Sequence, residues 1–398
     1  MSEEPAHAAR LRRMLFEAWG SSEDPVFVVR APGRVNLIGE HTDYNQGLVL
    51  PAAIALDISI ALRPRRDRRV ELHSLALGET RAFDLDDVKQ RRSAGGTSRT
   101  WIDYVAGMAW ALGGADIELR GLQGVIESRL PVGSGLASSA AFLLASAWAL
   151  MDHENRPLPS PEHLAALAHR AEEEFVGVRS GVMDQLAASL GRVGHALLID
   201  CRSLEIEAIP LPKGVVLVVC DSGVPRRLSE SAYNERRAQC EEGVRLLRQR
   251  LPGVESLRDV QLETLERWRS DLPETIASRC EHVIRENDRV RAAVRALRSG
   301  ALGEIGPLFS ASHASLRTLF EVSSPELDTL VEIASGIDGV VGARLTGAGF
   351  GGCTVNLVRP EAVDMFRETV TRHYAERTGG TATIHVVKTA NGAGLTHP

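Results

Sequence analysis

Lysine is nearly absent from this chain of 398 residues, which contains it only at Lys89, Lys213 and Lys388. None of the three lies in a P-loop run, G-x-x-x-x-G-K-[ST], so this type of nucleotide site is excluded. The formal net charge is -6, so the chain has no excess of positive charge with which to bind the phosphate backbone of a nucleic acid. We therefore expect no nucleic-acid partner.

Cysteine and long apolar runs are also scarce. The five cysteines are odd in number and form no C-x-x-C pair, so we expect neither a disulfide framework nor a structural zinc site. We therefore expect the protein in a reducing compartment such as the cytoplasm. The first residues, MSEEPAHAARLRR, lack the apolar stretch of a signal peptide. No apolar run reaches about 18 residues, so we expect no membrane span.

The order of the expected elements predicts an α+β fold, because strands and helices follow one another without the strict alternation of a doubly wound sheet. Strands are predicted at 26–38, 48–62, 69–74, 116–127, 196–199, 215–221, 340–345, 353–358 and 381–387. Helices are predicted at 6–19, 101–112, 138–151, 161–174, 184–190, 229–250, 274–298, 303–319 and 325–335. The length suits two domains, which we place at residues 1–205 and 206–398.

The first unusual segment is RAPGRVNLIGEHTDYN at residues 30–45. Arg34 lies within an apolar strand, where an arginine usually requires an anionic partner. Glu40, His41 and Asp43 follow closely and supply donors and acceptors that could bind several hydroxyls of a polyol. The alternative is a polar turn without a ligand.

The second segment is LPVGSGLASSA at residues 130–140, followed by the helical run AFLLASAWAL. Glycines let the backbone approach a ligand, and a helix N-terminus offers free N–H groups, so this segment favours a phosphate site without a lysine. Ser138 and Ser139 add hydroxyls for phosphate or Mg²⁺. The alternative is a glycine turn with a serine N-cap.

The third segment, LTGAGFGGCT at residues 345–354, contains a literal G-x-G-x-x-G at Gly347, Gly349 and Gly352. A dinucleotide site needs a helix after this motif, but the strand-like CTVNLV follows, so we reject that interpretation and the dehydrogenase that it implies. The pattern instead predicts a strand, a glycine-rich turn and a strand packed closely against another part of the chain. The alternative is a β-bulge or tight hairpin.

Together, the three segments resemble the signature motifs of the GHMP small-molecule kinases, and GRVNLIGEHTDYN is similar to the motif that distinguishes galactokinases among them. The runs W-x-x-Y-V-x-G at 101–107, GVMDQ at 181–185 and SAYNERR at 231–237 agree, so the resemblance extends from about residue 26 to 358. Two departures are Ala137, where galactokinases usually have serine, and Ala348, where many members have glycine. The resemblance implies a two-domain GHMP kinase fold with the active site in the cleft between the domains.

The resemblance also implies roles for individual residues. Arg34 and Asp184 match the catalytic pair. The sugar contacts correspond to Glu40, His41, Asp43, Gly181 and Tyr233. The phosphate-binding loop for ATP corresponds to Gly133, Ser134, Gly135, Leu136, Ala137, Ser138 and Ser139. The partners of Mg²⁺ correspond to Ser139 and Glu172.

The implied reaction is the ATP-dependent phosphorylation of the C1 hydroxyl of α-D-galactose by a monomer, the first step of galactose catabolism, with Asp184 as the base. Alternatives are a GHMP kinase for N-acetylgalactosamine or arabinose, and a sensor that binds galactose and ATP without turnover; the GEHTDYN run opposes mevalonate. Taken without the resemblance, Asp184 could be a helix N-cap and Glu172 part of a solvated acidic face. Likewise, Tyr233 could be a packing ring and His41 a turn residue.

Overall fold

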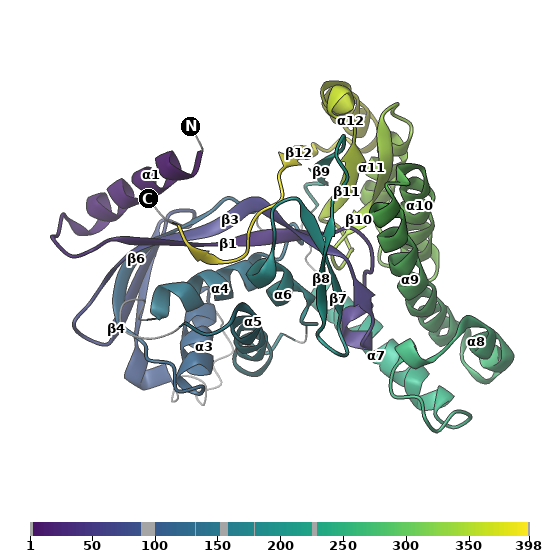
Figure 1. The fold of residues 1–398 in the computed structure, drawn as a ribbon, viewed down its shortest axis with the longest axis horizontal. Coiled ribbons are helices and arrows are strands. Elements are labelled where there is room, and N and C mark those ends of the chain that lie inside the picture. Colours follow the sequence, from purple (N-terminus) through teal and green to yellow (C-terminus); the bar gives the residue numbers. More distant parts are fainter. Residues whose placement is uncertain are drawn as a thin grey trace.

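The computed structural model describes residues 3–88, 100–131, 133–151, 158–178, 180–224 and 229–396. Figure 1 shows two halves arranged along the longest axis of the molecule. The half built mainly from the first part of the chain contains a large sheet with helices on both faces, and the other half contains a second sheet and a group of long helices. This is the α+β architecture that the sequence predicts.

The large sheet has six strands in the order β13-β1-β3-β6-β4-β5. In chain order, its strands are β1 (Phe27–Asn36), β3 (Pro51–Pro64), β4 (Arg69–Ser74), β5 (Glu79–Asp84), β6 (Leu122–Ser128) and β13 (Gly394–Leu395). Helix α1 (Glu3–Trp19) packs on one face, against β3 and β6. The opposite face is covered by α3 (Ile102–Gly113), α4 (Ser138–Leu150), α5 (Pro161–Arg170) and α6 (Met183–Leu190).

A small sheet joins β2 (Leu48–Val49), β7 (His195–Asp200) and β8 (Ile206–Pro210). Strands β7 and β8 form an antiparallel hairpin, in which His195 pairs with Pro210 and Ile199 with Ile206. The domain boundary that we place at residue 205 falls in the turn of this hairpin, and it stays a prediction.

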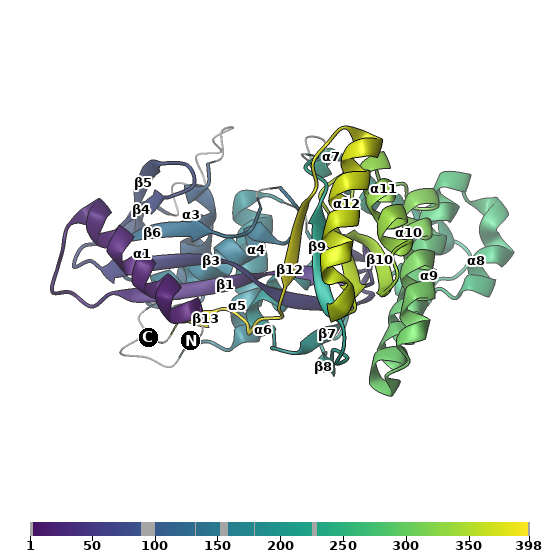
Figure 2. The same ribbon diagram turned by 90° about the horizontal axis from the view of Figure 1, so that it is seen from above.

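The second large sheet has four antiparallel strands in the order β10-β11-β9-β12. They are β9 (Val216–Asp221), β10 (Val340–Thr346), β11 (Cys353–Val358) and β12 (Thr383–Val387). Figure 2 shows α12 lying along this sheet, with the other long helices beyond it. The helices of this half are α7 (Ser229–Leu247), α8 (Leu262–Trp268), α9 (Glu274–Ser299), α10 (Leu302–Thr318), α11 (Pro325–Ser335) and α12 (Val363–Thr378).

The end of the chain returns to the first sheet, where β13 pairs with β1. On the way, the tail accompanies α6: the N–H of Gly392 donates to the carbonyl of Gly191 at 2.8 Å, and that of Ala393 to Ala188 at 2.9 Å. The N–H of Ala390 donates to the carbonyl of Ala53 on β3 at 2.9 Å. The tail therefore ties α6 to the sheet that carries β1.

Most predicted elements are present, and three of them, β4, β11 and α11, have the predicted bounds. The predicted helix 161–174 is divided, because α5 ends at Arg170 and a π-helix, η3 (Ala171–Val176), follows. The predicted strand 116–127 begins only at Leu122, since Asp116 has a left-handed backbone with φ 56°. Within the described residues, no helix has the length and apolarity that crossing a bilayer requires.

The prediction lacks β5, β8, β13, α8 and α12. Helix α12 is the longest of these, and it buries only Phe366, Val370 and Tyr374, one residue per turn. So narrow an apolar stripe gives little helical periodicity in the sequence.

Candidate active site

A cavity of about 440 Å³ lies where the two halves meet. It is bordered by β1, the loop after β1, the loop before α4, the start of α6, α7 and the turn after β10. The predicted site residues that line it are Arg34, Glu40, His41, Asp43, Gly133, Gly135, Ala137, Ser138, Ser139, Glu172, Gly181, Asp184 and Tyr233. The fold thus brings together segments that are more than about 300 residues apart in sequence, from Arg34 to Ala348.

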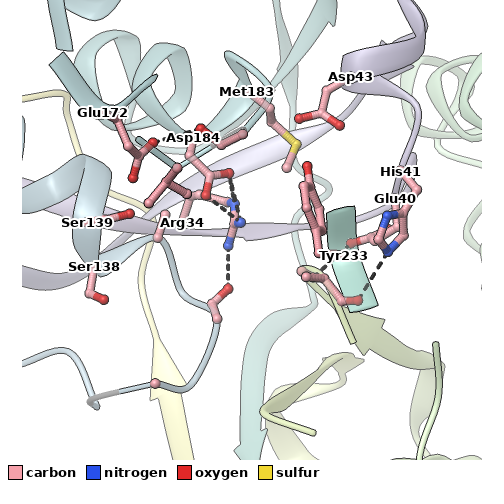
Figure 3. A pocket seen from close by; sticks show the side chains of 18 of the residues that line it. Arg34, Glu40, His41, Asp43, Ser138, Ser139, Glu172, Met183, Asp184 and Tyr233 are labelled. Atoms are coloured by element: carbon pink, nitrogen blue, oxygen red, sulfur yellow. Dashed lines mark hydrogen bonds and ion pairs between the residues drawn. The ribbon is translucent and has the colours of Figure 1, made fainter. Parts of the chain in front are cut away.

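Arg34 on β1 and Asp184 on α6 form a two-pronged ion pair (Figure 3). Arg34 Nε donates to Asp184 Oδ1 at 2.8 Å, and Nη2 donates to Oδ2 at 2.9 Å. The arginine side chain is only 5% exposed, whereas that of Asp184 is 26% exposed and faces the cavity. The N-cap of α6 is Val182, so the interpretation of Asp184 as an N-cap is wrong. Its position in the first turn still favours a negative charge.

The loop before α4 is held against Arg34. Arg34 Nη1 donates to the carbonyl of Gly135 at 2.6 Å, and the Arg34 N–H donates to that of Leu136 at 3.0 Å. Gly133, Gly135 and Ala137 have left-handed backbones, with φ of 72°, 78° and 62°. The chain then enters α4, whose first N–H groups have no partner within the helix. This is the geometry of an anion site.

Two residues of this loop direct their side chains away from the cavity. Ser134 Oγ donates to the carbonyl of Pro131 at 2.8 Å, and the Leu136 side chain is buried in the apolar core. Only their main-chain groups are therefore available to a ligand.

Glu172 lies in the π-helix η3 and is buried, whereas the adjacent Glu173 and Glu174 are exposed, so the solvated-face interpretation of Glu172 is wrong. Its carboxylate accepts hydrogen bonds from Ser180 Oγ at 2.8 Å and Gln185 Nε2 at 2.6 Å. The Ser139 hydroxyl is a further partner, and burial raises the pKa of Glu172.

Among the described residues, the hydrogen-bond partners of Glu172 are neutral and do not balance its charge, which suits a cation. No cluster of three His, Cys, Asp or Glu side chains suited to a metal occurs in the described ranges. Mg²⁺ does not need one, because it commonly takes one or two carboxylates together with substrate phosphates. Glu172 and Ser139 therefore fit this ion.

Asp43 and Gly181 are in direct contact. A β-carbon at residue 181 would lie 1.8 Å from Asp43 Oδ2, so only glycine is compatible with this position of the carboxylate. Burial, together with the charge of Asp184, raises the pKa of Asp43 to about 6.

Glu40 is almost fully buried and pairs with Arg344 of β10. Its other carboxylate oxygen, Oε1, accepts a hydrogen bond from the Gly347 N–H at 3.1 Å. Burial raises the pKa of Glu40 to about 7, while the guanidinium of Arg344 opposes this rise.

Both ring nitrogens of His41 have partners: Nδ1 lies 2.9 Å from the Tyr44 hydroxyl, and Nε2 lies 3.1 Å from the Ala348 carbonyl. Burial lowers the pKa of His41 to about 3, so the ring is neutral. Nε2 then carries the proton and donates to Ala348, and the Tyr44 hydroxyl donates to Nδ1. A hydrogen bond from either nitrogen to a sugar would have to replace one of these partners.

The rings of Tyr233 and His41 lie 5.6 Å apart, and Tyr233 faces the cavity from α7 (Figure 3). Tyr233 thus both packs against its neighbours and borders the cavity.

The third segment forms the turn between the antiparallel strands β10 and β11, which confirms the strand–turn–strand prediction. It packs against the first segment. Thr346 Oγ1 accepts from the Asn36 N–H at 2.8 Å and donates to the Asn36 carbonyl at 3.0 Å. Gly347 and Ala348 contact Glu40 and His41 as described above.

Several residues around the cavity are absent from the sequence prediction. Those that line it directly are Tyr104, Val178, Ser180, Met183, Asn234, Gly347 and Ala348. Tyr104, Met183 and Asn234 belong to runs that resemble the family, and Gly347 and Ala348 belong to the third segment, so these stretches were the available signal. Arg344 lies behind the cavity in an apolar strand, and the rule applied to Arg34 could have identified it.

Three family models match the chain. A galactokinase galactose-binding signature matches residues 15–64, the N-terminal domain of the GHMP kinases matches residues 103–192, and the C-terminal domain of the GHMP kinases matches residues 293–376.

Similar curated proteins include galactokinases of Roseiflexus sp. (strain RS-1), 46% identical with 93% of each chain covered, and of Chloroflexus aggregans, 46% identical with 90% of each chain covered. Among solved structures, Lactococcus lactis galactokinase complexed with galactose superimposes with a TM-score of 0.91 at 37% identity, covering 98% of this chain and 99% of that one. A Methanococcus jannaschii mevalonate kinase, 19% identical with a TM-score of 0.68 and covering 93% of this chain and all of that one, shares the fold. The chain therefore belongs to the galactokinase family of the GHMP kinases.

Proposed function

We propose that this protein transfers the γ-phosphoryl group of ATP to the C1 hydroxyl of α-D-galactose, giving galactose 1-phosphate and ADP, the first step of galactose catabolism. The observation that carries the proposal is the Arg34–Asp184 pair, which faces one cavity together with a glycine-rich loop and a loop of hydroxyl-binding side chains. The galactose bound to the Lactococcus lactis relative supports the choice of sugar.

Asp184 is the proposed base. A sugar hydroxyl is a weak acid, and a carboxylate near its oxygen accepts the proton as the new P–O bond forms. In a loose transition state the proton leaves late, so a carboxylate of ordinary basicity suffices. What supports Asp184 is its exposure to the cavity and its orientation by two hydrogen bonds from Arg34.

Arg34 is the proposed cation beside the reacting oxygens. Its contact with the Gly135 carbonyl connects the phosphate loop to Asp184, so one side chain sets the distance between the phosphate and the base. Backbone N–H groups of residues 133–139 and the N-terminus of α4 would hold the phosphates of ATP. Ser138 and Ser139 line the cavity and add their hydroxyls.

Glu40, His41, Asp43, Gly181 and Tyr233 are the proposed sugar contacts. Ionised Asp43 and Glu40 would accept hydrogen bonds from sugar hydroxyls, and Gly181 gives Asp43 its place. Tyr233 offers a ring and a hydroxyl.

Mg²⁺ is the proposed metal, with Glu172 and Ser139 as its protein partners. When bound, the ion would neutralise charge on the phosphates during transfer. Gln185 and Ser180 fix the carboxylate of Glu172 by hydrogen bonds.

We further propose that the protein acts as a monomer in the cytoplasm. All five cysteines are free thiols, as is usual in a reducing compartment such as the cytoplasm.

The alternatives are a kinase for N-acetylgalactosamine or arabinose and a sensor without turnover. An assay of ADP release with galactose, its C4 epimer glucose, N-acetylgalactosamine and arabinose distinguishes them. We expect turnover with galactose and little with glucose. Absence of ADP release with galactose would overturn the proposal.

Asp184→Ala tests the mechanism. We expect kcat to fall about 10²- to 10⁴-fold, because the base is lost, while galactose binding measured by calorimetry is retained. Asp184→Asn is the matched variant: it keeps the shape and loses the basicity, so it should be equally inactive. A wild-type kcat in either variant would contradict the role of Asp184.

A further inference from the structure

A buried arginine on β10 lies directly behind the proposed sugar site. The Arg344 side chain is 0% exposed, pairs with Glu40 and does not line the cavity. Its Nη1 donates to the Leu37 carbonyl at 2.8 Å. One guanidinium therefore holds both the carboxylate of Glu40 and the backbone three residues before it.

Glu286 on α9 holds this arrangement from the other side. Its Oε1 lies 3.6 Å from Arg344 Nη2 and accepts a hydrogen bond from the Gly39 N–H at 3.0 Å. Ser312 Oγ on α10 donates to the same oxygen at 2.6 Å, and Arg289 donates to Oε2 at 2.6 Å. The residue before Glu40 is thus fixed to the helical half.

The two contacts of Glu40 orient its carboxylate without saturating it. A carboxylate has about four lone-pair sites, and Arg344 and the Gly347 N–H occupy one each. The remaining sites can accept sugar hydroxyls at the cavity. Without the guanidinium, a carboxylate at this depth would turn or take up a proton.

We propose that Arg344 is a positioning residue for sugar binding: its guanidinium, braced by Glu286, holds the carboxyl group of Glu40 oriented and favours its ionised form, so that β10 and α9 set the affinity for galactose without touching it. The inference rests on the proposed function, in which Glu40 contacts the sugar. It assigns no role to Arg344 at the phosphates, because the hydrogen bonds and ion pairs of its guanidinium are made with residues 36–40 and Glu286.

A double-mutant cycle tests whether Arg344 acts through Glu40. The four proteins are the wild type, Arg344→Met, Glu40→Gln and the double variant. We expect Arg344→Met to raise the KM and Kd for galactose about 10- to 100-fold, with the KM for ATP changed less than about twofold. In the Glu40→Gln background, the same substitution should change the galactose KM by less than about threefold.

A second substitution covers the case in which Arg344→Met does not fold. Arg344→Lys keeps the charge but cannot reproduce the planar fork, so we expect an intermediate rise in galactose KM that also disappears in the Glu40→Gln background. Arg279→Met is the control: Arg279 on α9 is equally buried, bonds to Gln239, Leu319 and Glu321 and does not contact residues 36–40. It should leave the galactose KM unchanged.

The outcomes separate this inference from the proposed function. Equal rises in the KM for both substrates, or an equal loss with and without Glu40, would overturn the role of Arg344 in an enzyme that still phosphorylates galactose. A wild-type galactose KM for Glu40→Gln would show that Glu40 does not contact the sugar, and this would also overturn the inference about Arg344. Failure of the wild type to release ADP with galactose would instead overturn the proposed function.

Discussion

Two carboxyl groups with raised pKa values face the proposed sugar site. The pKa of Glu40 is raised to about 7 and that of Asp43 to about 6, in both cases mainly by burial. An ionised carboxylate only accepts hydrogen bonds, whereas protonation turns one of its oxygens into a donor, so acceptor sites are lost as the pH falls through these values. The free enzyme should therefore lose affinity for galactose in mildly acidic solution.

This loss can be measured as kcat/KM for galactose, which reports the ionisation of the free enzyme. For the wild type, we expect the slope of log kcat/KM against pH to approach two below about pH 6, because two protons are taken up. Asp43→Asn should lower the plateau and reduce the slope to about one. A slope of two in this variant would mean that Asp43 is not one of the two groups.

Single residues differ in how far the sequence reveals them. Arg34 was predictable, because an arginine in an apolar strand needs an anion. Its contact with Asp184 was not predictable from local pattern, since 150 residues separate the two and only the packing of α6 beside β1 brings them together. The resemblance to a family supplied the assignment of Asp184.

Among the elements, the turn between β10 and β11 depends on glycine in a way that can be tested. Gly349 has φ +77°, and a β-carbon there would lie 2.1 Å from the Val322 carbonyl after α10. Gly300 at the end of α9 has nearly the same φ, +72°, but open space around it. An alanine at residue 300 would therefore have the backbone strain alone, whereas an alanine at residue 349 would have the same strain and a steric conflict in addition.

We expect Gly300→Ala to lower the free energy of unfolding by about 1 kcal/mol, the cost of a left-handed alanine. Gly349→Ala should cost about 3 kcal/mol, because the collision with Val322 adds to the strain. Urea unfolding of both variants measures the difference. Equal losses would show that the turn can move away from α10.

Some secondary-structure elements cannot be predicted from the pattern of apolar residues. The long helices and the buried strands have enough apolar residues to be recognised, but the change from α5 to a π-helix at Ala171 leaves no periodic signal over so short a segment. That change nevertheless belongs to the site, because Glu172 lies within it. Short edge strands such as β8 and β13 were missed for the same reason.

At the scale of the whole molecule, the C-terminal tail links elements of both halves. It leaves β12 of the second sheet, contacts α6 and β3, and ends beside β1. Arg34 and Asp184 lie on two of the elements that the tail connects, β1 and α6. The distance between these side chains should therefore depend on the tail.

Truncation after Lys388 removes these contacts. We expect a lower melting temperature and a fall in kcat of about tenfold, since small displacements of catalytic groups are costly. Thermal unfolding and the ADP-release assay measure both effects. Thr396→Ala is a mild control, because the contact of residue 396 with Val28 uses the backbone N–H. A truncated enzyme with wild-type kcat would show that α6 holds its place unaided.

The cavity draws its positive charge from arginine, and none of the described residues that line it is a lysine. The chain has only three lysines, so amine-reactive esters have few points of attachment, and Lys213 and Lys388, the two in the described part of the chain, lie outside that lining. Coupling to a solid support through Lys213 or Lys388 should therefore leave the cavity open. Reagents that modify guanidinium groups should have the opposite effect and inactivate it.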